Sequence, residues 1–451
     1  MAEARNVQPD LYYNSRGMEK MAVRIVSKEN IVPNDPTPQS LKIFKLSVLD
    51  QTVVKLYVPL MLFYLNNNSS NLDSVIQDMS KLLKKSLSES LTRYYPLAGK
   101  VRDDFHIDCN DEGVYYIETR VNCRLSDFLS QSPGDEMVNR LVPEEARESP
   151  MGNYPLIIQV NIFSCGGIAI CTCISHKFLD GTTYMLFMKD WTSAARGSSS
   201  EIVDPSFIVP SLFPQIPSLS FKSPMSFSKI KFASQRFVFD GPKLAALKAK
   251  TNMLLSGSKS SRFEVVSALL WKCVAKAACK SNDSALRKPF NLGVFINLRG
   301  KNCVPENAAG NLIWFGLAQC KLSPELEHKT LVEQIKKCKA EISDDFVEAI
   351  KGDAGTPTLV KIAEMMTSGE ISFSLSITSM CNMGQYELDF GWGKPVWFYY
   401  CNLKTVNFIS LCDTGAGGGI QAIVSLSKQE MAILETDPEL LAFASVNPAP
   451  L

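Results

Sequence analysis

Imidazole chemistry in this sequence has three possible sources, because the chain of 451 residues contains only three histidines. His106 and His328 both lie in charged stretches, which is typical of solvated surface positions. His176 differs, because it follows an apolar run and belongs to the segment Ser-His-Lys-Phe-Leu-Asp-Gly at 175–181. A neutral imidazole at the end of a buried strand can face a cleft and accept a proton, so His176 is the candidate general base.

Two apolar, β-branched runs ahead of His176 predict the strands that position it. They cover 156–163 and 168–175, and the residues Ser-Cys-Gly-Gly at 164–167 between them are typical of a hairpin turn. A helix is expected over about 182–195. His176 then lies in the loop between a buried strand and a helix.

Asp180 follows His176 by four residues, but this spacing is weak on its own. Asp and Glu account for 46 of 451 residues, so three histidines have roughly three chances in ten of such a match. A hydrogen-bonded histidine in a tight turn explains the spacing equally well. A metal pair is a third explanation, but no further cluster of ligand residues accompanies it, so no metal is predicted.

The chain is too long for one ordinary domain, and its length predicts two. Residues 1–20 are polar and patternless and are expected to form a disordered extension. A segment rich in Ser and Pro predicts a crossover linker over 201–228, between an N-terminal domain at 21–200 and a C-terminal domain at 229–451. Strands and helices mix in both halves, so the expected fold class is α/β with α+β mixed sheets.

Apolar periodicity predicts three further helices. The first covers 73–91 and ends at Tyr95-Pro96. In the C-terminal half, Ser261 to Glu264 has the spacing of a capping box ahead of a helical run at 265–278. Apolar residues from Leu331 to Ile350 predict one more amphipathic helix.

The charge and the cysteine content exclude several classes of protein. Lys and Arg number 47 against 46 Asp and Glu, so no net field favours nucleic acid or an anionic membrane. No apolar run is long enough to span a bilayer, and the N-terminus lacks the core of a signal peptide, which predicts a cytoplasmic protein. The 13 cysteines include no C-x-x-C pair and are expected to stay reduced, with Cys171 and Cys173 in the core.

Two motifs together give the sequence a specific resemblance. His176-x-x-x-Asp180-Gly181 resembles the HxxxD motif of plant BAHD acyltransferases, and Asp-Phe-Gly-Trp-Gly at 389–393 matches the DFGWG motif of that family. The similarity covers 21–445. The stretch 25–38 is most similar to the branch that includes vinorine synthase and related acetyltransferases of alkaloids and terpenoids. Further segments that resemble the family are Leu46 to Gln51, Tyr95 to Lys100 and Asn297 to Arg299.

The resemblance implies a two-domain BAHD fold with a central solvent channel, which holds CoA at one mouth and the acceptor at the other. It implies a catalytic set of His176, Asp180 and Asp389 with unequal roles. His176 takes the proton of the acceptor hydroxyl. Asp180 turns away from the histidine and pairs with Arg299, because a buried carboxylate needs such a partner.

Asp389 is implied to hold its own loop in shape, essential but remote from the chemistry. Gly391 and Gly393 permit a tight backbone in that loop, and Trp392 packs against its surroundings. These three residues and Arg299 are the expected structural support of the site.

Lys259, Ser260 and Ser261 are cofactor-binding candidates for the phosphates of CoA, because basic and hydroxyl groups beside a helix N-terminus suit anions. A flexible loop with an ordinary helix cap explains them equally well. The glycine run at 415–419 fits neither G-x-G-x-x-G nor the P-loop pattern and is predicted to be a turn between strands. No permanently bound cofactor is expected, since acyl-CoA would be a co-substrate.

The chain departs from the family at 378–382, where it reads Thr-Ser-Met-Cys-Asn. Many members carry Ser-Trp followed by a basic residue there, and the indole N–H is a candidate donor to the oxyanion of the tetrahedral intermediate. Met380 stands in the place of the tryptophan and cannot donate a hydrogen bond. Thr378, Ser379 and the backbone N–H groups remain as oxyanion candidates.

The expected function is that of a CoA-dependent O-acyltransferase of specialised metabolism, which moves an acetyl group from acetyl-CoA to a hydroxyl of an alkaloid or terpenoid. One alternative is an acylsugar or tropane-type acyltransferase that uses a branched short-chain acyl-CoA. Another is a non-catalytic binding protein on the same fold, against which the intact His176, Asp180, Arg299 and Asp389 argue. The expected partners are small molecules, with no nucleic acid and no membrane, and the protein is expected to be a monomer.

Overall fold

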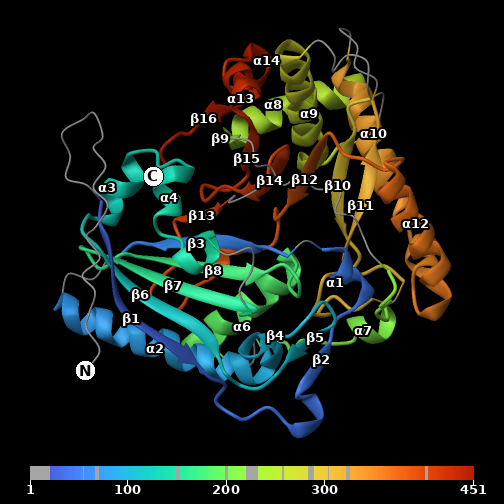
Figure 1. Cartoon of the computed structure of the whole chain (residues 1–451). Helices are drawn as coiled ribbons and strands as arrows, with labels where there is room; N and C mark the ends of the chain where they lie inside the picture. The colour runs from blue at the N-terminus through green and yellow to red at the C-terminus, as the bar shows by residue number, and fades with distance from the viewer. Residues whose placement is uncertain are drawn as a thin grey trace.

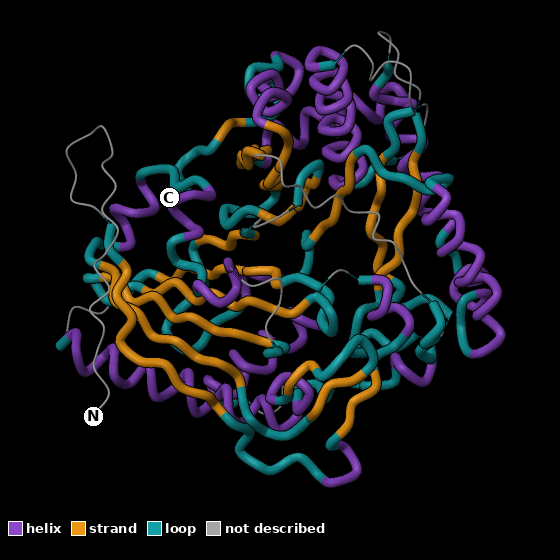
Figure 2. The backbone as a smooth tube through the Cα atoms, in the orientation of Figure 1, coloured by secondary structure: helices purple, strands orange, loops and turns teal. Residues whose placement is uncertain are grey.

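Two large β-sheets and the helices that cover them make up the computed structural model of the chain (Figure 1). The tube in Figure 2 shows the strands of the two sheets in different halves of the molecule. This is the mixed α/β class that the sequence predicts. The structure describes residues 21–450 except 54, 67–70, 149–152, 199–201, 220–231, 256–258, 283–288, 303, 321–325 and 402–404.

The first sheet has six strands in the order β1-β6-β7-β8-β3-β13. β6 and β7 run parallel, and the other neighbours are antiparallel. The predicted hairpin is confirmed, since β7 and β8 pair and a turn at 164–167 joins them. The strands are β1 (Val23–Ile31), β3 (Tyr57–Tyr64), β6 (Val114–Val121), β7 (Leu156–Phe163), β8 (Ile168–Ser175) and β13 (Trp397–Tyr400).

Helices cover both faces of this sheet, so that every residue of β3, β7 and β8 is buried. Because side chains alternate along a strand, Leu62 joins the core beneath the two long helices, whereas Phe63 joins the core beneath the three short ones. The long helices are α2 (Leu72–Arg93) and α6 (Gly181–Arg196), and the short ones are α3 (Leu125–Ser130), α4 (Asp135–Asn139) and α5 (Glu144–Glu148).

The second sheet has seven strands in the order β11-β10-β12-β14-β15-β9-β16. Its strands are β9 (Phe232–Phe239), β10 (Leu292–Asn297), β11 (Ile313–Ala318), β12 (Leu375–Ser379), β14 (Phe408–Asp413), β15 (Ile420–Ser427) and β16 (Ser445–Val446). Five helices pack on it and share one core with it (Figure 1). They are α8 (Gly241–Leu254), α9 (Arg262–Ser281), α10 (His328–Glu341), α13 (Lys428–Leu434) and α14 (Pro438–Leu441).

Smaller elements complete the fold. A three-stranded sheet in the order β2-β5-β4 consists of β2 (Ile43–Lys45), β4 (Lys100–Val101) and β5 (His106–Asp108). A further core contains residues of α1 (Val48–Thr52), α7 (Val209–Leu212), α11 (Asp344–Ala349) and α12 (Thr356–Ser368). The 3-10 turns are η1 (Gln39–Leu41), η2 (Tyr95–Ala98), η5 (Asp353–Gly355) and η6 (Gln385–Glu387).

The chain crosses between the halves more than once. β13 belongs to the C-terminal half of the sequence, yet it pairs with β3 at the edge of the first sheet. The predicted linker at 201–228 contains α7, and Ser206 pairs with Ala308 in an isolated bridge. Residues 220–228 lie outside the described part of the chain, as do residues 1–20. The domain boundaries therefore stay predictions.

The expected helices are found with one correction. α2, α6 and α9 match the predicted segments to within a few residues, and Ser261 forms the predicted capping box with Glu264 at the start of α9. The single helix expected from Leu331 to Ile350 is wrong, because α10 ends at Glu341 and α11 begins after Ser343. Ser343 has extended backbone, and its side chain accepts a hydrogen bond from the N–H of Phe346. This N-cap stops the first helix and starts a second.

Candidate active site

His176 directly follows β8, in the loop that leads to α6. Its backbone N–H donates to the carbonyl of Leu56 at 3.0 Å, which fixes the loop against the end of β3. The side chain lines a largely apolar cavity, here called the histidine cavity. Its lining comes from both halves of the chain and includes Leu56, Ile174, Trp314, Thr378 and Phe408.

Asn311 orients the imidazole of His176. The Asn311 Nδ2 donates at 2.8 Å to Asp50 Oδ1 and at 2.8 Å to the carbonyl of His176, so the amide can turn only its Oδ1 toward the ring. That oxygen lies 3.2 Å from His176 Nδ1, which must therefore carry the hydrogen. Nε2 is then the nitrogen with a free lone pair, and it has no hydrogen bond to any residue that the structure describes.

Asp50 holds Asn311 in place from a fully buried position. Its carboxylate accepts from the backbone N–H and the side-chain hydroxyl of Ser47 at 2.7 and 2.6 Å, and from the Asn311 backbone N–H at 3.2 Å. Burial raises the pKa of Asp50 to about 6, although these hydrogen bonds oppose the shift. The Lys177 ammonium, also buried, donates to the backbone carbonyl of Asp50 at 3.1 Å.

The imidazole of His176 is neutral at physiological pH. Burial lowers its pKa below the usual value of 6.5, and this effect outweighs the negative charge of Asp180 and the hydrogen bond to Asn311, which both act to raise it. A neutral ring with a bare Nε2 is the protonation state that a general base requires.

Asp180 and Arg299 form the predicted ion pair. Arg299 Nη1 lies 2.7 Å from Asp180 Oδ2 and Nη2 lies 3.1 Å from Oδ1, a two-pronged contact in which the side chains are 0% and 1% exposed. Burial alone would raise the pKa of Asp180, but the charge of Arg299 and the hydrogen bonds to the carboxylate hold that pKa below its usual value. Asp180 is therefore ionised and fully committed to this contact.

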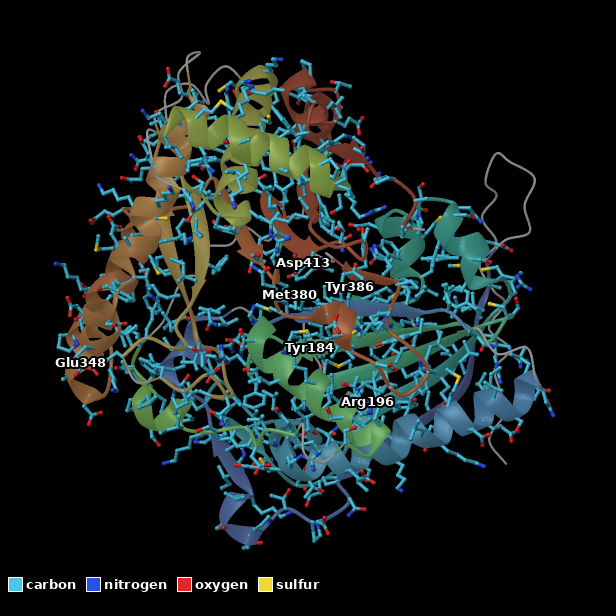
Figure 3. The ribbon with its side chains drawn as sticks, turned by 180° about the vertical axis from the view of Figure 1, so that it is seen from behind. Tyr184, Arg196, Glu348, Met380, Tyr386 and Asp413 are labelled. Atoms are coloured by element: carbon cyan, nitrogen blue, oxygen red, sulfur yellow. The ribbon has the colours of Figure 1, made fainter. Side chains whose placement is uncertain are left out.

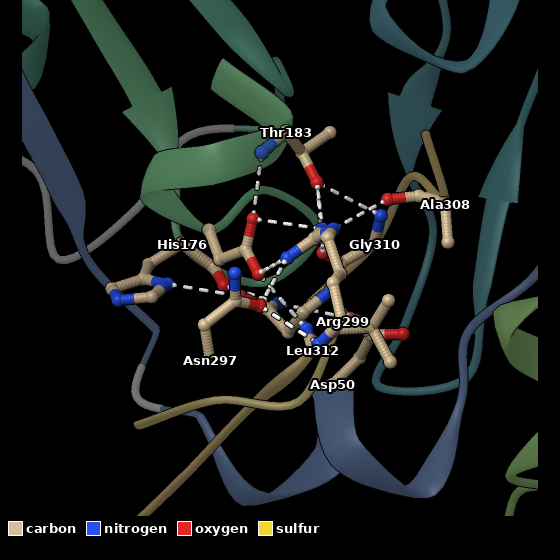
Figure 4. A network of polar contacts seen from close by, with 10 residues as sticks. Asp50, His176, Thr183, Asn297, Arg299, Ala308, Gly310 and Leu312 are labelled. Carbon is tan, nitrogen blue, oxygen red and sulfur yellow. Dashed lines mark hydrogen bonds and ion pairs between the residues drawn. The ribbon is translucent and has the colours of Figure 1, made fainter. Parts of the chain in front are cut away.

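The same cluster joins the start of α6 to the loop ahead of β11 (Figure 4). Asp180 is the N-cap of α6 and accepts from the N–H of Thr183 at 2.7 Å, while its other oxygen accepts from Leu312 N–H at 3.0 Å. Arg299 donates to the carbonyls of Ala308 and Gly310 at 2.9 and 3.1 Å. Asp180 thus ties together the loop that carries His176 and the loop that carries Asn311.

The DFGWG segment forms a loop of its own at the surface of the molecule. Asp389 Oδ1 accepts from the backbone N–H groups of Gly391 at 2.7 Å and Gly393 at 2.9 Å, and both glycines have positive φ values of 107° and 115°. Trp392 stacks on Phe390 with ring centroids 5.4 Å apart. None of these residues lines the histidine cavity, which agrees with a role remote from the chemistry.

A second cavity, here called the cationic cavity, lies on the other side of β12. Its basic side chains are Lys189 of α6, Arg262 of α9 and Lys339 of α10. Arg262 Nη2 is 2.9 Å from Asp413 Oδ1, and Lys339 Nζ is 2.6 Å from Glu264 Oε1. Other lining residues are Thr182, Met185, Ser261, Asn297, Ser379 and Asn382.

The three predicted CoA-binding residues lie at different places around this cavity. Ser261 lines it as the N-cap of α9. Lys259 is exposed, and its backbone carbonyl accepts from Lys336 at 3.0 Å. Ser260 is buried at 3% exposure, and its backbone N–H donates to Asn252 Oδ1 at 2.9 Å. Of the three, only Ser261 is a lining residue.

The end of β12 separates the two cavities. Thr378 and Met380 line the histidine cavity, whereas Ser379 between them lines the cationic cavity, as the alternation of a strand requires. Ser379 Oγ accepts from the N–H of Cys381 at 3.2 Å. Phe295 of β10 lines both cavities, so they adjoin each other at this point.

Met380, at the position where the resemblance expects a tryptophan, directly follows β12 (Figure 3). Its side chain lies beside the N-terminus of α6, because a Cβ built on Gly181 would be 3.6 Å from Met380 Cγ. Its backbone N–H donates to the carbonyl of Leu411 at 2.8 Å, so that group is not available to an oxyanion.

The other histidines do not reach the histidine cavity. His106 on β5 faces Asp103 at 3.2 Å and is 27% exposed. The prediction that His328 is solvated is wrong, because the first turn of α10 packs beside α8. His328 Nε2 lies 3.0 Å from Thr251 Oγ1, and burial lowers the pKa of His328 to about 4.

Several other sequence features have a structural outcome. The glycine run at 415–419 is the predicted turn, between β14 and β15. Cys171 and Cys173 are buried with their sulfurs 3.8 Å apart, and the described cysteines are all free thiols. Within the described ranges, no group of three or more His, Cys, Asp or Glu side chains is arranged to hold a metal ion. In the same part of the chain, no helix is both long and apolar enough to cross a bilayer.

Two residues of the site escaped the sequence analysis. Asn311 follows Gly310 in a segment without periodicity, and 135 positions separate it from His176. Asp50 belongs to a segment that resembles the family, but nothing local to it indicates contact with Asn311, which is 261 positions away. A buried acid next to a capping serine was the only signal, and it predicts a helix start rather than a site.

A neutral histidine in an apolar cavity that adjoins a cationic one, on two mixed sheets, is an arrangement that suits a two-substrate transferase. The model of the Transferase family matches residues 21–441, and the chain belongs to this family, the BAHD acyltransferases. The protein is therefore an acyltransferase that depends on acyl-CoA.

Curated relatives and a solved structure match more than nine-tenths of the chain. Epi-neemfruitin B 7-O-acetyltransferase of Melia azedarach is 36% identical, over 96% of this chain and 100% of the relative. Stemmadenine O-acetyltransferase of Catharanthus roseus is 34% identical, over 92% and 96%. The crystal structure of vinorine synthase superimposes with a TM-score of 0.82 at 31% identity, over 95% of this chain and 100% of that chain.

Proposed function

We propose that this enzyme transfers an acetyl group from acetyl-CoA to a hydroxyl of a polycyclic terpenoid or alkaloid, with His176 as general base. The observation that carries this proposal is the bare Nε2 of a neutral imidazole, aimed by Asn311 and lining a largely apolar cavity. The names of the relatives, which are acetyltransferases of limonoids and of stemmadenine, support the acetyl donor and the acceptor class.

The proposed reaction is a direct transfer without an acyl-enzyme. His176 Nε2 takes the proton of the acceptor hydroxyl while the hydroxyl oxygen attacks the thioester carbonyl. The CoA thiolate then leaves and takes the proton from the imidazolium. General base catalysis contributes about 10²- to 10⁴-fold. The remaining acceleration comes from holding two substrates in contact, which two adjoining cavities can do.

We place the CoA in the cationic cavity. Lys189, Arg262 and Lys339 lie there beside Ser261 at the N-terminus of α9, and basic groups at a helix N-terminus favour phosphates. Lys259 is exposed near the same helix start and remains a candidate for an outer phosphate. Ser260 is a weaker candidate because its side chain is buried.

We assign the oxyanion contact to Thr378 rather than Ser379. Thr378 lines the same cavity as His176, whereas Ser379 lines the opposite one and accepts a hydrogen bond from the N–H of Cys381. Removing one oxyanion donor costs on the order of 10²- to 10³-fold in kcat, so Thr378→Val should lower kcat by up to this factor. A Thr378→Ser variant, which keeps the hydroxyl, is the control.

We propose that Asp389 and Asp180 hold the loops around the site in shape and take no part in the proton transfer. Asp389 fixes the loop of Gly391, Trp392 and Gly393, and its backbone carbonyl accepts from Arg196 of α6. This contact links the loop to the far end of the helix whose start carries Asp180.

A panel of acyl-CoA donors and acceptor alcohols, with release of free CoA thiol as the readout, tests the function. Acetyl-CoA should be the preferred donor; preference for a branched short-chain acyl-CoA would favour the acylsugar or tropane-type alternative. The absence of any thiol release above hydrolysis, with every acceptor, would favour the binding protein. Action in the cytoplasm as a monomer stays a prediction, which fractionation of the tissue and sedimentation of the pure protein would check.

A further inference from the structure

The described lining of the histidine cavity has few polar side chains and no acidic or permanently charged one. Among the residues that the structure describes, no Asp, Glu, Lys or Arg lines the cavity. Its hydroxyl and imidazole side chains are those of Thr52, Tyr57, His176, Thr378, Tyr400 and Thr405. An acceptor must therefore bind through apolar contacts and a small number of uncharged hydrogen bonds.

The nearest buried carboxylates cannot serve as counter-ions for a cationic acceptor. Asp180 is occupied by Arg299 on both oxygens. Asp50 accepts from Ser47 and Asn311 and is not among the lining residues. A charge transferred from water to such a site without a partner costs so much that the group loses its proton instead. Burial already has this effect on His176, whose pKa it lowers.

Aromatic rings could in principle replace a carboxylate, since a cation is attracted to the face of an indole. The indole of Trp314 is the strongest candidate in this cavity, but its faces are occupied. It stacks on Phe315 at 5.2 Å and 16°, and it packs against Phe346 at 5.7 Å. Trp314 is only 3% exposed. Trp314 therefore offers no open ring face to a cationic acceptor.

One hydroxyl in the cavity is free to meet a substrate oxygen. Tyr400 of β13 lines the cavity, and its hydroxyl makes no hydrogen bond to another residue in the described ranges. The ring lies against Phe408, with centroids 6.3 Å apart. Burial raises the pKa of Tyr400, so the group stays a donor at any physiological pH.

We infer that the acceptor enters as an electroneutral, oxygenated polycycle of the terpenoid class, with a second oxygen bound by Tyr400, and that an amine-bearing acceptor enters only as its free base. This inference rests on the proposed function and narrows its acceptor class. It excludes a protonated alkaloid as the bound species.

The test compares two acceptors in the full-length enzyme, a neutral polycyclic alcohol and an amine-bearing one whose pKa lies above the assay range. The ratio of their kcat/KM values, amine over neutral, cancels the titration of the enzyme itself. The ratio should rise about tenfold per pH unit, because only the free base binds. A quaternary N-methyl derivative should not be acetylated. A ratio that stays flat with pH, or turnover of the quaternary derivative within tenfold of the neutral alcohol, overturns the inference.

Binding without acetyl-CoA separates this inference from the proposed function. Trp314 in the cavity wall should report acceptor binding by its fluorescence. If neutral acceptors bind and quaternary ones do not, while no acceptor yields free CoA thiol, the proposed function fails and the inference about charge stands. Binding of the quaternary derivative as tight as that of the neutral alcohol overturns the inference whatever the activity.

The contact with Tyr400 has its own variant. Tyr400→Phe should raise KM for a polyoxygenated acceptor about five- to thirty-fold, the effect of one lost hydrogen bond, and should leave KM unchanged for an analogue that lacks the second oxygen. Tyr94→Phe makes the same chemical change outside the cavity and should leave both KM values unchanged. Equal KM values for both acceptors in Tyr400→Phe and wild-type enzyme would overturn the assignment.

Discussion

The loop after β8 connects two polar networks that differ in their access to a substrate and in the ionisation of their acids. At its start, His176 contacts Asn311, and Asn311 contacts Asp50, in a chain that ends at the histidine cavity. Four residues on, Asp180 and Arg299 lie in a closed cluster with side chains 1% and 0% exposed. The first network ends at Nε2 of His176, whose lone pair is open to a substrate. In the second network, the hydrogen bonds of Asp180 and Arg299 are all to other protein groups.

The two buried acids show the difference in their ionisation. Burial raises the pKa of Asp50 to about 6, whereas Arg299 and several N–H groups hold the pKa of Asp180 below its usual value. Asp180 is ionised, and its carboxylate joins α6 to the loop ahead of β11 through hydrogen bonds to both. One short motif thus contains a group for chemistry and a group for architecture, and substitutions should separate them.

Removing the imidazole should give the largest loss of activity. His176→Ala deletes the proposed base and should lower kcat/KM by about 10²- to 10⁴-fold. The thermal midpoint should move little, because the side chain faces a cavity rather than a packed core. His106→Ala, the same change at a site outside the cavity, is the matched control and should be fully active. Wild-type turnover by His176→Ala would remove the general base from the mechanism.

Breaking the closed network should instead cost stability. Arg299→Ala leaves Asp180 as an unpaired buried charge, which destabilises the fold by about 3–5 kcal/mol. Denaturant unfolding measures the loss. The control is Arg102→Ala, whose ion pair with Asp108 has side chains 45% and 32% exposed, so its loss should change the free energy of unfolding far less.

Equal stability of Arg299→Ala and Arg102→Ala would contradict the division between the two networks. The double variant Asp180→Asn with Arg299→Met provides a second measurement. It removes both charges, so it should recover part of the stability that Arg299→Ala loses.

Asn311→Ala should have an intermediate effect on activity. It releases the ring of His176 and removes the hydrogen bond that selects the tautomer, a loss of about 1–2 kcal/mol or roughly five- to thirty-fold in kcat/KM. KM for acetyl-CoA should stay unchanged, because Asn311 does not line the cationic cavity. A purely structural role would lower the unfolding midpoint and leave the kcat of the folded enzyme intact.

The sequence predicts the parts of this site that are local. The apolar run of β8 and the turn before it are short-range patterns, so they predict that His176 lies at a strand end. The pairing of Asp180 with Arg299 is implied by the resemblance to the family. Asn311 could not be predicted, because a contact across 135 positions leaves no trace in local periodicity. For the same reason, local patterns do not predict the pairing of β13 with β3, which brings Tyr400 to the cavity.

The pH profile should show the smallest effect and the finest difference between the networks. A base works only when it is unprotonated, and burial lowers the pKa of His176 below 6.5. The value of kcat/KM for a neutral acceptor should therefore stay level as pH falls through 6.5, and it should decline about tenfold per unit only below the shifted pKa. Asn311→Ala removes a hydrogen bond that raises the pKa, so its decline should begin at still lower pH. Asp180 titrates below its usual range, so the stability that it contributes is present above that range and should be lost as pH falls through the lowered pKa. A midpoint at or above 6.5 in the wild-type profile would mean that the imidazole of His176 is not desolvated. The description of the first network, as a buried chain that ends on a neutral imidazole, would then be wrong.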